Sequence, residues 1–338
     1  MALVSRPALD LLAEVSPSYI PDDESPLWFL RARAHPFLSA LSPSRLFLEQ
    51  TFRPHTMGLP GVLNATPLDR PALTLCLGTK QRKENFANLC RALSFTAEGG
   101  KVLFCLENDL GAKSYEKHLK KFGLSVESVS KMKSRLLVTD VPSDGGERLR
   151  EWAPYTSILE NEECSLQSHP ALFGWNKVDA ASKLLAESTQ GLLEGEGADL
   201  GSGYGYLSVE ALRSNPRIES LSLVEAELYG LLPAFENVRT IPSNAQLRYY
   251  WADALQWKPS RLFDFILTNP PFHHENKTDP ELARSFLHKG LVLLKPGASL
   301  YFVSHRTLTL RGETKKLVSD WQELGGDSAF HAIRLIRK

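Results

Sequence analysis

The sequence predicts an α/β protein built from two tandem domains. Its 338 residues exceed the usual length of one domain. Short apolar runs of strand length alternate with stretches of helical periodicity, which favours parallel strands joined by right-handed crossovers. Hydrophobic residues make up 43% of the chain and charged residues 23%. This ordinary globular composition excludes a disordered, collagen-like or coiled-coil chain.

The first half shows two strand–helix pairs. The apolar run at 73–78 predicts a buried strand, and the spacing of apolar residues over 83–95 predicts a helix. A second strand is expected at 101–107 and a basic helix at 113–123. Proline is frequent before residue 70, and no order of elements can be given there.

An acidic stretch separates the two halves. Residues 140–163 contain seven acidic and two basic side chains, together with prolines and glycines that interrupt any regular pattern. We expect a linker, part of which can pack, with the domain boundary between residues 160 and 161.

The second half predicts one doubly wound sheet that ends in an antiparallel hairpin. Its strands are expected at 197–200, 221–225, 246–251, 262–268 and 299–304, with two late strands near 317–322 and 329–336. Its helices are expected at 178–193, from 206 onward, at 227–237 and at 279–294. Together they give a mostly parallel sheet of seven strands.

Charge and hydropathy narrow the classes of function. The chain has 39 basic and 39 acidic side chains, so attraction to nucleic acid must come from a local patch. Residues 80–135 carry such an excess, with 12 basic against 6 acidic side chains. The N-terminus lacks the apolar core of a signal peptide, and no run approaches 18 apolar residues. We therefore expect a cytoplasmic protein without a membrane span.

The cysteines and histidines show no metal-binding pattern. Cys76, Cys90, Cys105 and Cys164 lack C-x-x-C spacing, and two of them lie in predicted buried strands. Such cysteines are typical of buried thiols in a reducing compartment. We expect no metal site.

A glycine-rich turn follows the first predicted strand of the second half. Gly201, Gly203 and Gly205 can bring backbone amides close to a ligand, although the same glycines can serve packing alone. Asp199 precedes the turn, and Glu225 ends the next strand, where a carboxylate can accept bonds from both ribose hydroxyls. An acid beside the turn suits an amine or a sulfonium better than a pyrophosphate. We therefore expect S-adenosylmethionine rather than NAD.

Asp253 follows the third predicted strand of the second half. In this topology it would lie at the adenine edge of such a cofactor. A helix cap is an equally good interpretation of the local sequence, but the neighbouring motifs favour the adenine contact.

The motif Asn269-Pro270-Pro271-Phe272 directly follows the strand at 262–268. Two prolines fix an extended turn at the end of a strand where α/β sheets bind ligands, although a plain turn is the alternative. The Asn269 side-chain oxygen and the Pro270 carbonyl can accept bonds from a planar exocyclic amine and orient its lone pair toward a methyl donor. Phe272 can stack on the base. The motif therefore predicts amine methylation.

Longer segments resemble one family. DLGSGYGYLS (199–208), LTNPPFHHENKTD (267–279) and FHAIRLIRK (330–338) are similar to the small-subunit ribosomal RNA guanine-N2 methyltransferase C family and its large-subunit relative. LFGWNKVDAASKLL (172–185) resembles the family's entry motif, which implies that Phe173 and Asp179 lie near the cofactor.

The resemblance implies two tandem Rossmann-like methyltransferase domains. Residues 1–160 would be a degenerate copy without the cofactor motif that assists RNA binding, and residues 161–338 would be catalytic. The strand at 73–78 is followed only by Gly78-Thr79-Lys80 instead of a glycine triplet, which agrees with that loss. The implied activity is methyl transfer from S-adenosylmethionine to the N2 amine of a guanine in ribosomal RNA, with 16S rRNA of the small subunit as the expected target.

The expected partner is ribosomal RNA or a ribosomal subunit, bound by a monomer. Seven basic side chains of the first half would contact phosphates, for which a solvated helix face is the alternative. They are Lys113, Lys117, Lys120, Lys121, Lys131, Lys133 and Arg135. Two other functions stay open: methylation of DNA adenine N6 or protein glutamine N5, and a non-catalytic RNA-binding or ribosome-assembly role.

Overall fold

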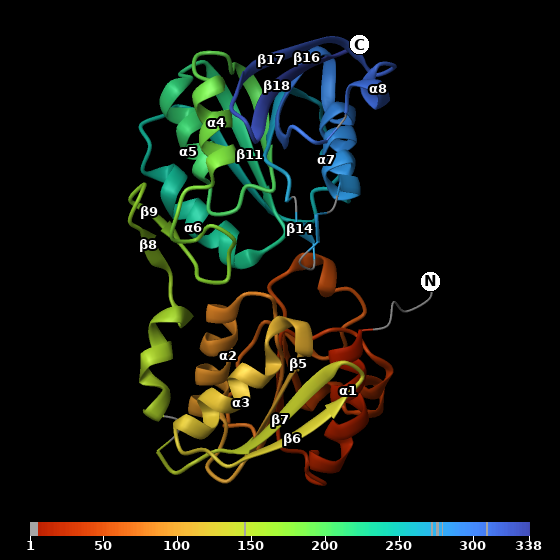
Figure 1. Ribbon diagram of the computed structural model, residues 1–338, viewed down its shortest axis with the longest axis vertical. Helices are drawn as coiled ribbons and strands as arrows, with labels where there is room; N and C mark the ends of the chain where they lie inside the picture. The colour runs from red at the N-terminus through yellow and green to blue at the C-terminus, as the bar shows by residue number, and fades with distance from the viewer. Residues whose placement is uncertain (1–5, 145–146, 272, 275–276, 279, 309) are drawn as a thin grey trace. The chain divides into compact units, whose positions relative to one another are not determined.

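The computed structural model describes residues 6–144, 147–271, 273–274, 277–278, 280–308 and 310–338. The chain forms two compact units, residues 1–157 and 158–338. Each unit is an α/β fold around a seven-stranded sheet that is mostly parallel, with antiparallel strands at one end (Figure 1). The predicted fold class is confirmed.

The sheet of unit 1 has the strand order β3-β2-β1-β4-β5-β7-β6. Its strands are β1 (Leu27–Leu30), β2 (Leu46–Glu49), β3 (Val62–Leu63), β4 (Leu73–Leu77), β5 (Lys101–Glu107), β6 (Val126–Lys131) and β7 (Ser134–Asp140). Its α-helices are α1 (Pro7–Val15), α2 (Arg82–Phe95) and α3 (Ala112–Lys121). The region before residue 70 thus supplies three strands that the sequence did not reveal.

Successive side chains of the unit 1 strands pack alternately into two apolar layers, one on each face of the sheet. Phe104 of β5 packs among residues of α2 and α3, whereas Leu103 and Cys105 pack on the other face with α1. The acidic stretch is only partly a linker. Its 3₁₀ segment (Glu147–Thr156) packs through Leu149 and Trp152 into the layer of α2 and α3, and a short hairpin, β8 (Leu159–Asn161) and β9 (Leu166–Ser168), follows in unit 2.

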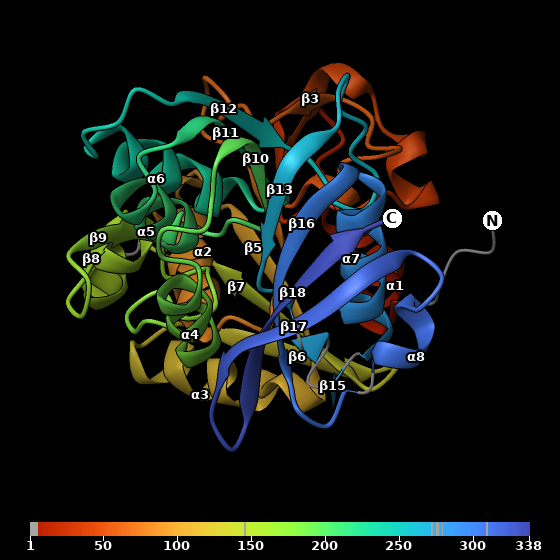
Figure 2. The same cartoon turned by 90° about the horizontal axis from the view of Figure 1, so that it is seen from above.

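The sheet of unit 2 has the strand order β12-β11-β10-β13-β16-β18-β17 (Figure 2). Its strands are β10 (Gly195–Leu200), β11 (Ile218–Glu225), β12 (Gln246–Trp251), β13 (Phe263–Thr268), β16 (Leu294–His305), β17 (Val318–Gly326) and β18 (Phe330–Arg337). A two-residue pair, β14 (His273–His274) and β15 (Lys277–Thr278), lies after β13. The helices are α4 (Ala180–Ser188), α5 (Tyr206–Ser214), α6 (Leu228–Arg239), α7 (Pro280–Val292) and α8 (Arg311–Thr314).

Helices cover both faces of this sheet. Figure 1 shows α4, α5 and α6 on one side and α7 on the other. Side chains of β13 pack on both faces of the sheet. Phe265 and Leu267 pack on the α4–α6 side, whereas Ile266 packs with α7. The helix predicted over 178–193 is shorter than expected and ends at Ser188.

The two sheets share one strand order when strands are ranked along each unit: third, second, first, fourth, fifth, seventh, sixth. β4 is therefore the fourth strand of unit 1 and corresponds to β13. The comparison of Gly78-Thr79-Lys80 with the glycine turn was wrong, because that turn follows the first strand of unit 2. Its counterpart in unit 1 follows β1, where the sequence reads Arg31-Ala32-Arg33.

Candidate active site

The glycine turn connects β10 to α5, as predicted. Gly201, Gly203 and Gly205 all have positive φ, at +77°, +54° and +85°. A Cβ on Gly203 would meet no atom within 4 Å, so its backbone faces open space that a ligand can enter. A Cβ on Gly205 would approach Ala234 to 3.1 Å, so this glycine permits α6 to pack closely.

Asp199 lies at the carboxyl end of β10 and is fully buried. Its Oδ2 accepts a 2.7 Å hydrogen bond from the Ser208 hydroxyl, whereas its Oδ1 has no hydrogen-bond partner. Burial raises the pKa of the Asp199 carboxyl to about 7. A buried carboxylate oxygen without a partner is costly in an empty protein, and a cationic group placed beside it would relieve that cost.

Glu225 ends β11 beside the glycine turn. Its Oε2 accepts from the Gly203 amide at 2.7 Å, and its Oε1 accepts from the Glu227 amide at 2.7 Å. Burial raises the pKa of Glu225. Each carboxylate oxygen has two lone pairs, so acceptor capacity remains for ligand hydroxyls.

Asp253 lies just beyond β12, at the same edge of the sheet. Its Oδ1 accepts from the Leu255 amide at 2.9 Å and so closes a turn, not the first turn of a helix, since residues 254–262 form no helix. The adenine contact stays a prediction.

Asn269 follows β13, the strand on the other side of β10. Its Nδ2 donates to Oδ2 of Asp179 at 2.7 Å and to Oγ of Ser182 at 2.7 Å. Asp179 is the N-cap of α4 and accepts from the Ser182 amide at 2.9 Å. The entry motif and the N-P-P-F motif, 90 residues apart, therefore meet through side chains.

The remaining predicted residues of unit 2 have different environments. Pro270 is buried and Pro271 is exposed, while Phe272 lies outside the described residues. Phe173, in the turn before α4, has 74% of its surface exposed. This exposed aromatic ring of the entry motif is available to cover a ligand, and its contact with the cofactor stays a prediction.

A family model describes this half of the chain. The methyltransferase small domain model matches residues 163–334, which include every predicted cofactor-binding and catalytic residue. The chain belongs to the methyltransferase small domain family. The match to this family ends at residue 334, four residues before the end of unit 2, and does not extend into unit 1.

Curated relatives of this family member are ribosomal RNA methyltransferases. The chain is 25% identical over 175 residues to ribosomal RNA large subunit methyltransferase G of Magnetococcus marinus, covering 52% of this chain and 47% of the relative. It is 26% identical over 227 residues to ribosomal RNA small subunit methyltransferase C of Buchnera aphidicola, covering 67% and 65%. The chain thus spans about half to two thirds of the length of these relatives.

A solved structure is similar along nearly the whole chain. The 16S rRNA N2 methyltransferase (RsmC) of T. thermophilus, solved with AdoMet and guanosine, superposes with a TM-score of 0.76 at 18% identity. The match covers 98% of this chain and 92% of that one. At this identity the likeness establishes the fold, including the tandem arrangement of two such domains.

Three residues of the site were not predicted. Ser182 contacts Asn269, Ser208 contacts Asp199, and Gly230 lets α6 approach the glycine turn, since a Cβ there would lie 3.0 Å from the Gly203 carbonyl oxygen. The N-cap pattern of an acid three residues before a serine could have indicated Ser182. Ser208 and Gly230 depend on how helices pack on the sheet, which local sequence does not show.

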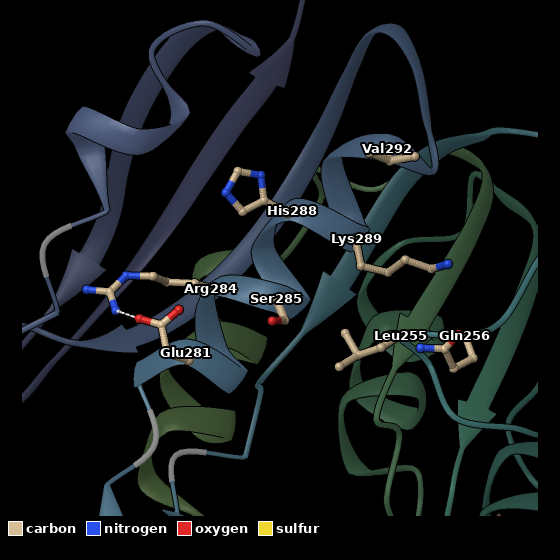
Figure 3. A pocket seen from close by; sticks show the side chains of 8 residues that line it. All are labelled: Leu255, Gln256, Glu281, Arg284, Ser285, His288, Lys289 and Val292. Atoms are coloured by element: carbon tan, nitrogen blue, oxygen red, sulfur yellow. Dashed lines mark hydrogen bonds and ion pairs between the residues drawn. The ribbon is translucent and has the colours of Figure 1, made fainter. Parts of the chain in front are cut away.

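A hollow lies beside α7 (Figure 3), the helix that covers the face of the sheet opposite α4 (Figure 1). Its described lining residues come from the turn after Asp253 and from one side of α7: Leu255, Gln256, Glu281, Arg284, Ser285, His288, Lys289 and Val292. Glu281 pairs with Arg284 at 2.6 Å, and the Lys289 ammonium donates to the Trp257 carbonyl. None of the predicted site residues within the described ranges lines it.

The cations predicted to contact RNA fall into two groups. Lys120 and Arg135 each pair with Glu116 at 2.7 Å, and Lys131 pairs with Glu14 at 2.5 Å. The other four are exposed and make no ion pair with any described residue: Lys113, Lys117, Lys121 and Lys133. Three of these lie on α3 at intervals of four residues and share one face.

The described residues include neither a candidate membrane span nor a candidate metal site. Within the described ranges, no helix has both the length and the apolar character needed to cross a bilayer. The same residues contain no group of three or more His, Cys, Asp or Glu side chains placed to hold a metal ion. Cys76, Cys90 and Cys105 are buried thiols and Cys164 is partly buried.

Proposed function

We propose that unit 2 transfers a methyl group from S-adenosylmethionine to the N2 amine of a guanine in ribosomal RNA, with 16S rRNA as the first target to test. The observation that carries this proposal is the meeting of Asp199, Glu225 and Asn269 at one edge of the sheet. They lie at the carboxyl ends of β10, β11 and β13, and β10 is the neighbour of both other strands. Ligands of open α/β sheets bind at this edge.

The residues of this edge fit the cofactor. The unpartnered Oδ1 of Asp199 suits its amine, and Glu225 keeps lone pairs for the ribose hydroxyls. The open space beside Gly203 admits a ligand against the backbone. S-adenosylmethionine supplies an electrophilic methyl group on a sulfonium, which is the reactive group this chemistry requires.

Asn269 and Pro270 would act on the nucleophile. The exocyclic amine of guanine is weakly nucleophilic because its lone pair is delocalised into the ring. Acceptance of its two N–H bonds by the Asn269 side-chain oxygen and the Pro270 carbonyl would fix the nitrogen and direct its lone pair toward the methyl carbon. In such a transfer the N–C bond would form as the C–S bond broke, and the nitrogen would then release one proton to water.

Guanine in RNA is favoured by the relatives. The small and large subunit enzymes that the chain resembles act on ribosomal RNA, and the structurally similar T. thermophilus enzyme was solved with guanosine. The target base must leave its stack, because its amine is inaccessible within a paired helix. The basic face of α3 supports an RNA-handling role for unit 1.

Methyl transfer to several substrates in parallel tests this proposal. Purified protein is incubated with labelled S-adenosylmethionine and 16S rRNA, 23S rRNA, adenine-containing duplex DNA or a release factor. We expect label in rRNA only, recovered as N2-methylguanosine after digestion. Label in DNA adenine or in protein glutamine would replace the guanine assignment. Absence of cofactor binding would favour the non-catalytic RNA-binding role.

A further inference from the structure

The side-chain amide of Asn269 can act on an amine in only one orientation. Its oxygen accepts hydrogen bonds, whereas its nitrogen only donates and would repel the N–H groups of an amine. The two ends have almost the same shape, so their assignment must come from their neighbours. The neighbours of Asn269 therefore decide whether the residue can orient a nucleophile.

The carboxylate of Asp179 makes this assignment unambiguous. An ionised carboxylate accepts hydrogen bonds and cannot donate. The Asn269 amide atom that lies 2.7 Å from Oδ2 of Asp179 must therefore be the nitrogen. Ser182 accepts the second N–H of this nitrogen at 2.7 Å, so both of its donors are used and the amide oxygen faces away from the pair.

We propose that Asp179 and Ser182 are positioning residues that hold the Asn269 amide with its oxygen presented to the amine to be methylated. This inference rests on the proposed function and names the residues on which its key hydrogen bond depends. It gives Asp179 a role different from the cofactor contact that the family resemblance implies.

Local structure fixes Asp179 itself. Its Oδ2 also accepts from the Ser182 amide at 2.9 Å and thereby caps α4. The preceding residue is held as well, because Oε2 of Glu163 accepts from the Val178 amide at 3.0 Å. Asp179, Ser182 and Asn269 are all only partly buried. They are thus rigidly held yet accessible to a substrate, unlike a core polar network.

A purely structural role for Asp179 makes a different prediction. If Asp179 only caps α4, serine should replace it well, since serine and aspartate are similarly good N-caps. The shorter serine side chain cannot also hold Asn269. Asparagine, in contrast, keeps an oxygen in the position of Oδ2 and can serve both bonds. Asp179→Ser and Asp179→Asn therefore separate capping from positioning.

The first experiment measures methylation of rRNA guanine at saturating S-adenosylmethionine, together with thermal stability and calorimetric cofactor affinity. We expect Asp179→Ser to lower kcat about 10- to 100-fold, the scale of a misplaced catalytic group. Its melting temperature and cofactor affinity should stay near wild type. Asp179→Asn should recover most of the rate. Ser182→Ala should lower kcat less, and the matched control Ser188→Ala, at the far end of the same helix, should leave it unchanged.

The second experiment exchanges the two groups. Asn269→Asp places two carboxylates together, so its rate should be low and should rise as the pH falls, because a shared proton relieves the repulsion. Adding Asp179→Asn should raise the rate of Asn269→Asp and remove this pH dependence, because an amide nitrogen at position 179 can donate to the carboxylate at 269. The same Asp179→Asn change should not raise the rate of the wild type.

The outcomes separate the inference from the proposed function. A wild-type chain that binds the cofactor but does not methylate guanine refutes the proposed function and, with it, this inference. A wild-type chain that methylates guanine, combined with a wild-type kcat for Asp179→Ser, refutes positioning alone. An effect of Asp179→Asn that is equal in the wild-type and Asn269→Asp backgrounds also refutes it, since it shows that the two side chains are not coupled.

Discussion

Unit 1 and unit 2 can be compared residue by residue at the carboxyl ends of their first two strands. In unit 1, Leu30 at the end of β1 pairs with Glu49, which precedes Gln50. In unit 2, Leu200 at the end of β10 pairs with Val224, which precedes Glu225. Gln50 is therefore the counterpart of Glu225. The same register aligns Arg31 with Gly201, and both have positive φ, at +57° and +77°.

The two counterparts keep one hydrogen bond and differ in the other. Oε1 of Gln50 accepts from the amide two residues on at 3.0 Å, as Oε1 of Glu225 does at 2.7 Å. Gln50, however, is 1% exposed, and its Nε2 donates to the Ala32 carbonyl at 2.6 Å. The amide nitrogen has replaced an acceptor oxygen, so unit 1 lacks the group that would accept ribose hydroxyls from this position.

The first turn shows the same contrast. In unit 2 the glycine turn leaves open space beside Gly203. In unit 1 the Arg31 side chain extends from the corresponding turn, pairs with Glu84 at 2.9 Å and contacts Thr51. In the same fold, the first turn therefore leaves open space beside Gly203 in unit 2 and carries the Arg31–Glu84 ion pair in unit 1. Side chains, and not strand order, separate the two.

The largest effect is expected on turnover when Asn269, the residue after β13, is replaced. Asn269→Ala removes the acceptor for the amine and should lower turnover about 10²- to 10³-fold, the scale of losing one preorganised hydrogen-bonding group. Steady-state methylation of rRNA measures it, and calorimetry should show cofactor affinity near wild type. Thr79→Ala, in the turn after the fourth strand of unit 1, is the control that should leave turnover unchanged. Near-normal turnover of Asn269→Ala would reduce the motif to a strand-ending turn.

The second effect is a loss of cofactor affinity when Glu225 is replaced by the residue found at its counterpart, Gln50. Glu225→Gln gives unit 2 the side chain of unit 1 and should weaken cofactor binding about 10- to 100-fold, because hydrogen bonds to a charged acceptor contribute about 1.5–3 kcal/mol each. Glu225→Ala should weaken it at least as much. Titration calorimetry gives the dissociation constants. If both variants bind like the wild type, the ribose assignment of Glu225 is wrong.

The third effect is a pH dependence of S-adenosylmethionine affinity, which we expect to come from Asp199 of unit 2. The Asp199 pKa is raised to about 7 in the folded protein, so the carboxyl must lose a proton to bind an amine cation. Affinity should rise by up to about tenfold per pH unit below pH 7 and level off above it. Asp199→Asn should bind weakly at every pH and flatten the profile. An equally steep profile in this variant would assign the proton to another group.

The same raised pKa has a consequence for stability. The pKa of an aspartate carboxyl in an unfolded chain is about 4, and burial raises that of Asp199 to about 7 in the folded protein. Stability from this group is therefore full below pH 4 and is lost as the pH rises to about 7, at about 1.4 kcal/mol per unit of raised pKa. Asp199→Asn should accordingly raise the melting temperature of the cofactor-free protein at pH 8.

The smallest effect tests RNA handling by unit 1. Replacement of Lys117, Lys120 and Lys121 with Ala should reduce the slope of log K against log salt by roughly two units if all three contact phosphate. Lys120 already pairs with Glu116, so a reduction by one to two units is expected. A matched triple variant of exposed cations in unit 2 (Lys183, Arg213 and Arg217 to Ala) should change the slope less. Equal slopes in both variants would place the RNA contact elsewhere.

The sequence predicted unit 2 well because its signals are local. β11 and β13 contain short apolar segments, and Asp199, Glu225 and Asn269 lie within one residue of the ends of β10, β11 and β13, so the strand order places them together. Unit 1 was harder, since β1 to β3 lie among prolines and 3₁₀ turns. Without β1, the sequence indicates β4 as the first strand of its sheet, and nothing marks Gln50 as the counterpart of Glu225.

Contacts between segments far apart in the sequence could not be predicted from local sequence patterns either. Asp179 was associated with the cofactor by resemblance, but its bond to Asn269 joins residues 90 positions apart. Ser208 is partner to Asp199 only because α5 folds back over the end of β10. Such pairs depend on how helices dock on the sheet, and no periodicity in the chain encodes them.

The stoichiometry of S-adenosylmethionine binding tests most directly the claim that two units of one fold carry one cofactor site. Calorimetric titration of the wild-type chain should give one site per chain. Gly203→Arg should abolish that site by filling the open space in unit 2, whereas Gln50→Ala should leave one site of unchanged affinity. Two sites in the wild type, or binding that survives Gly203→Arg and disappears with Gln50→Ala, would contradict the account.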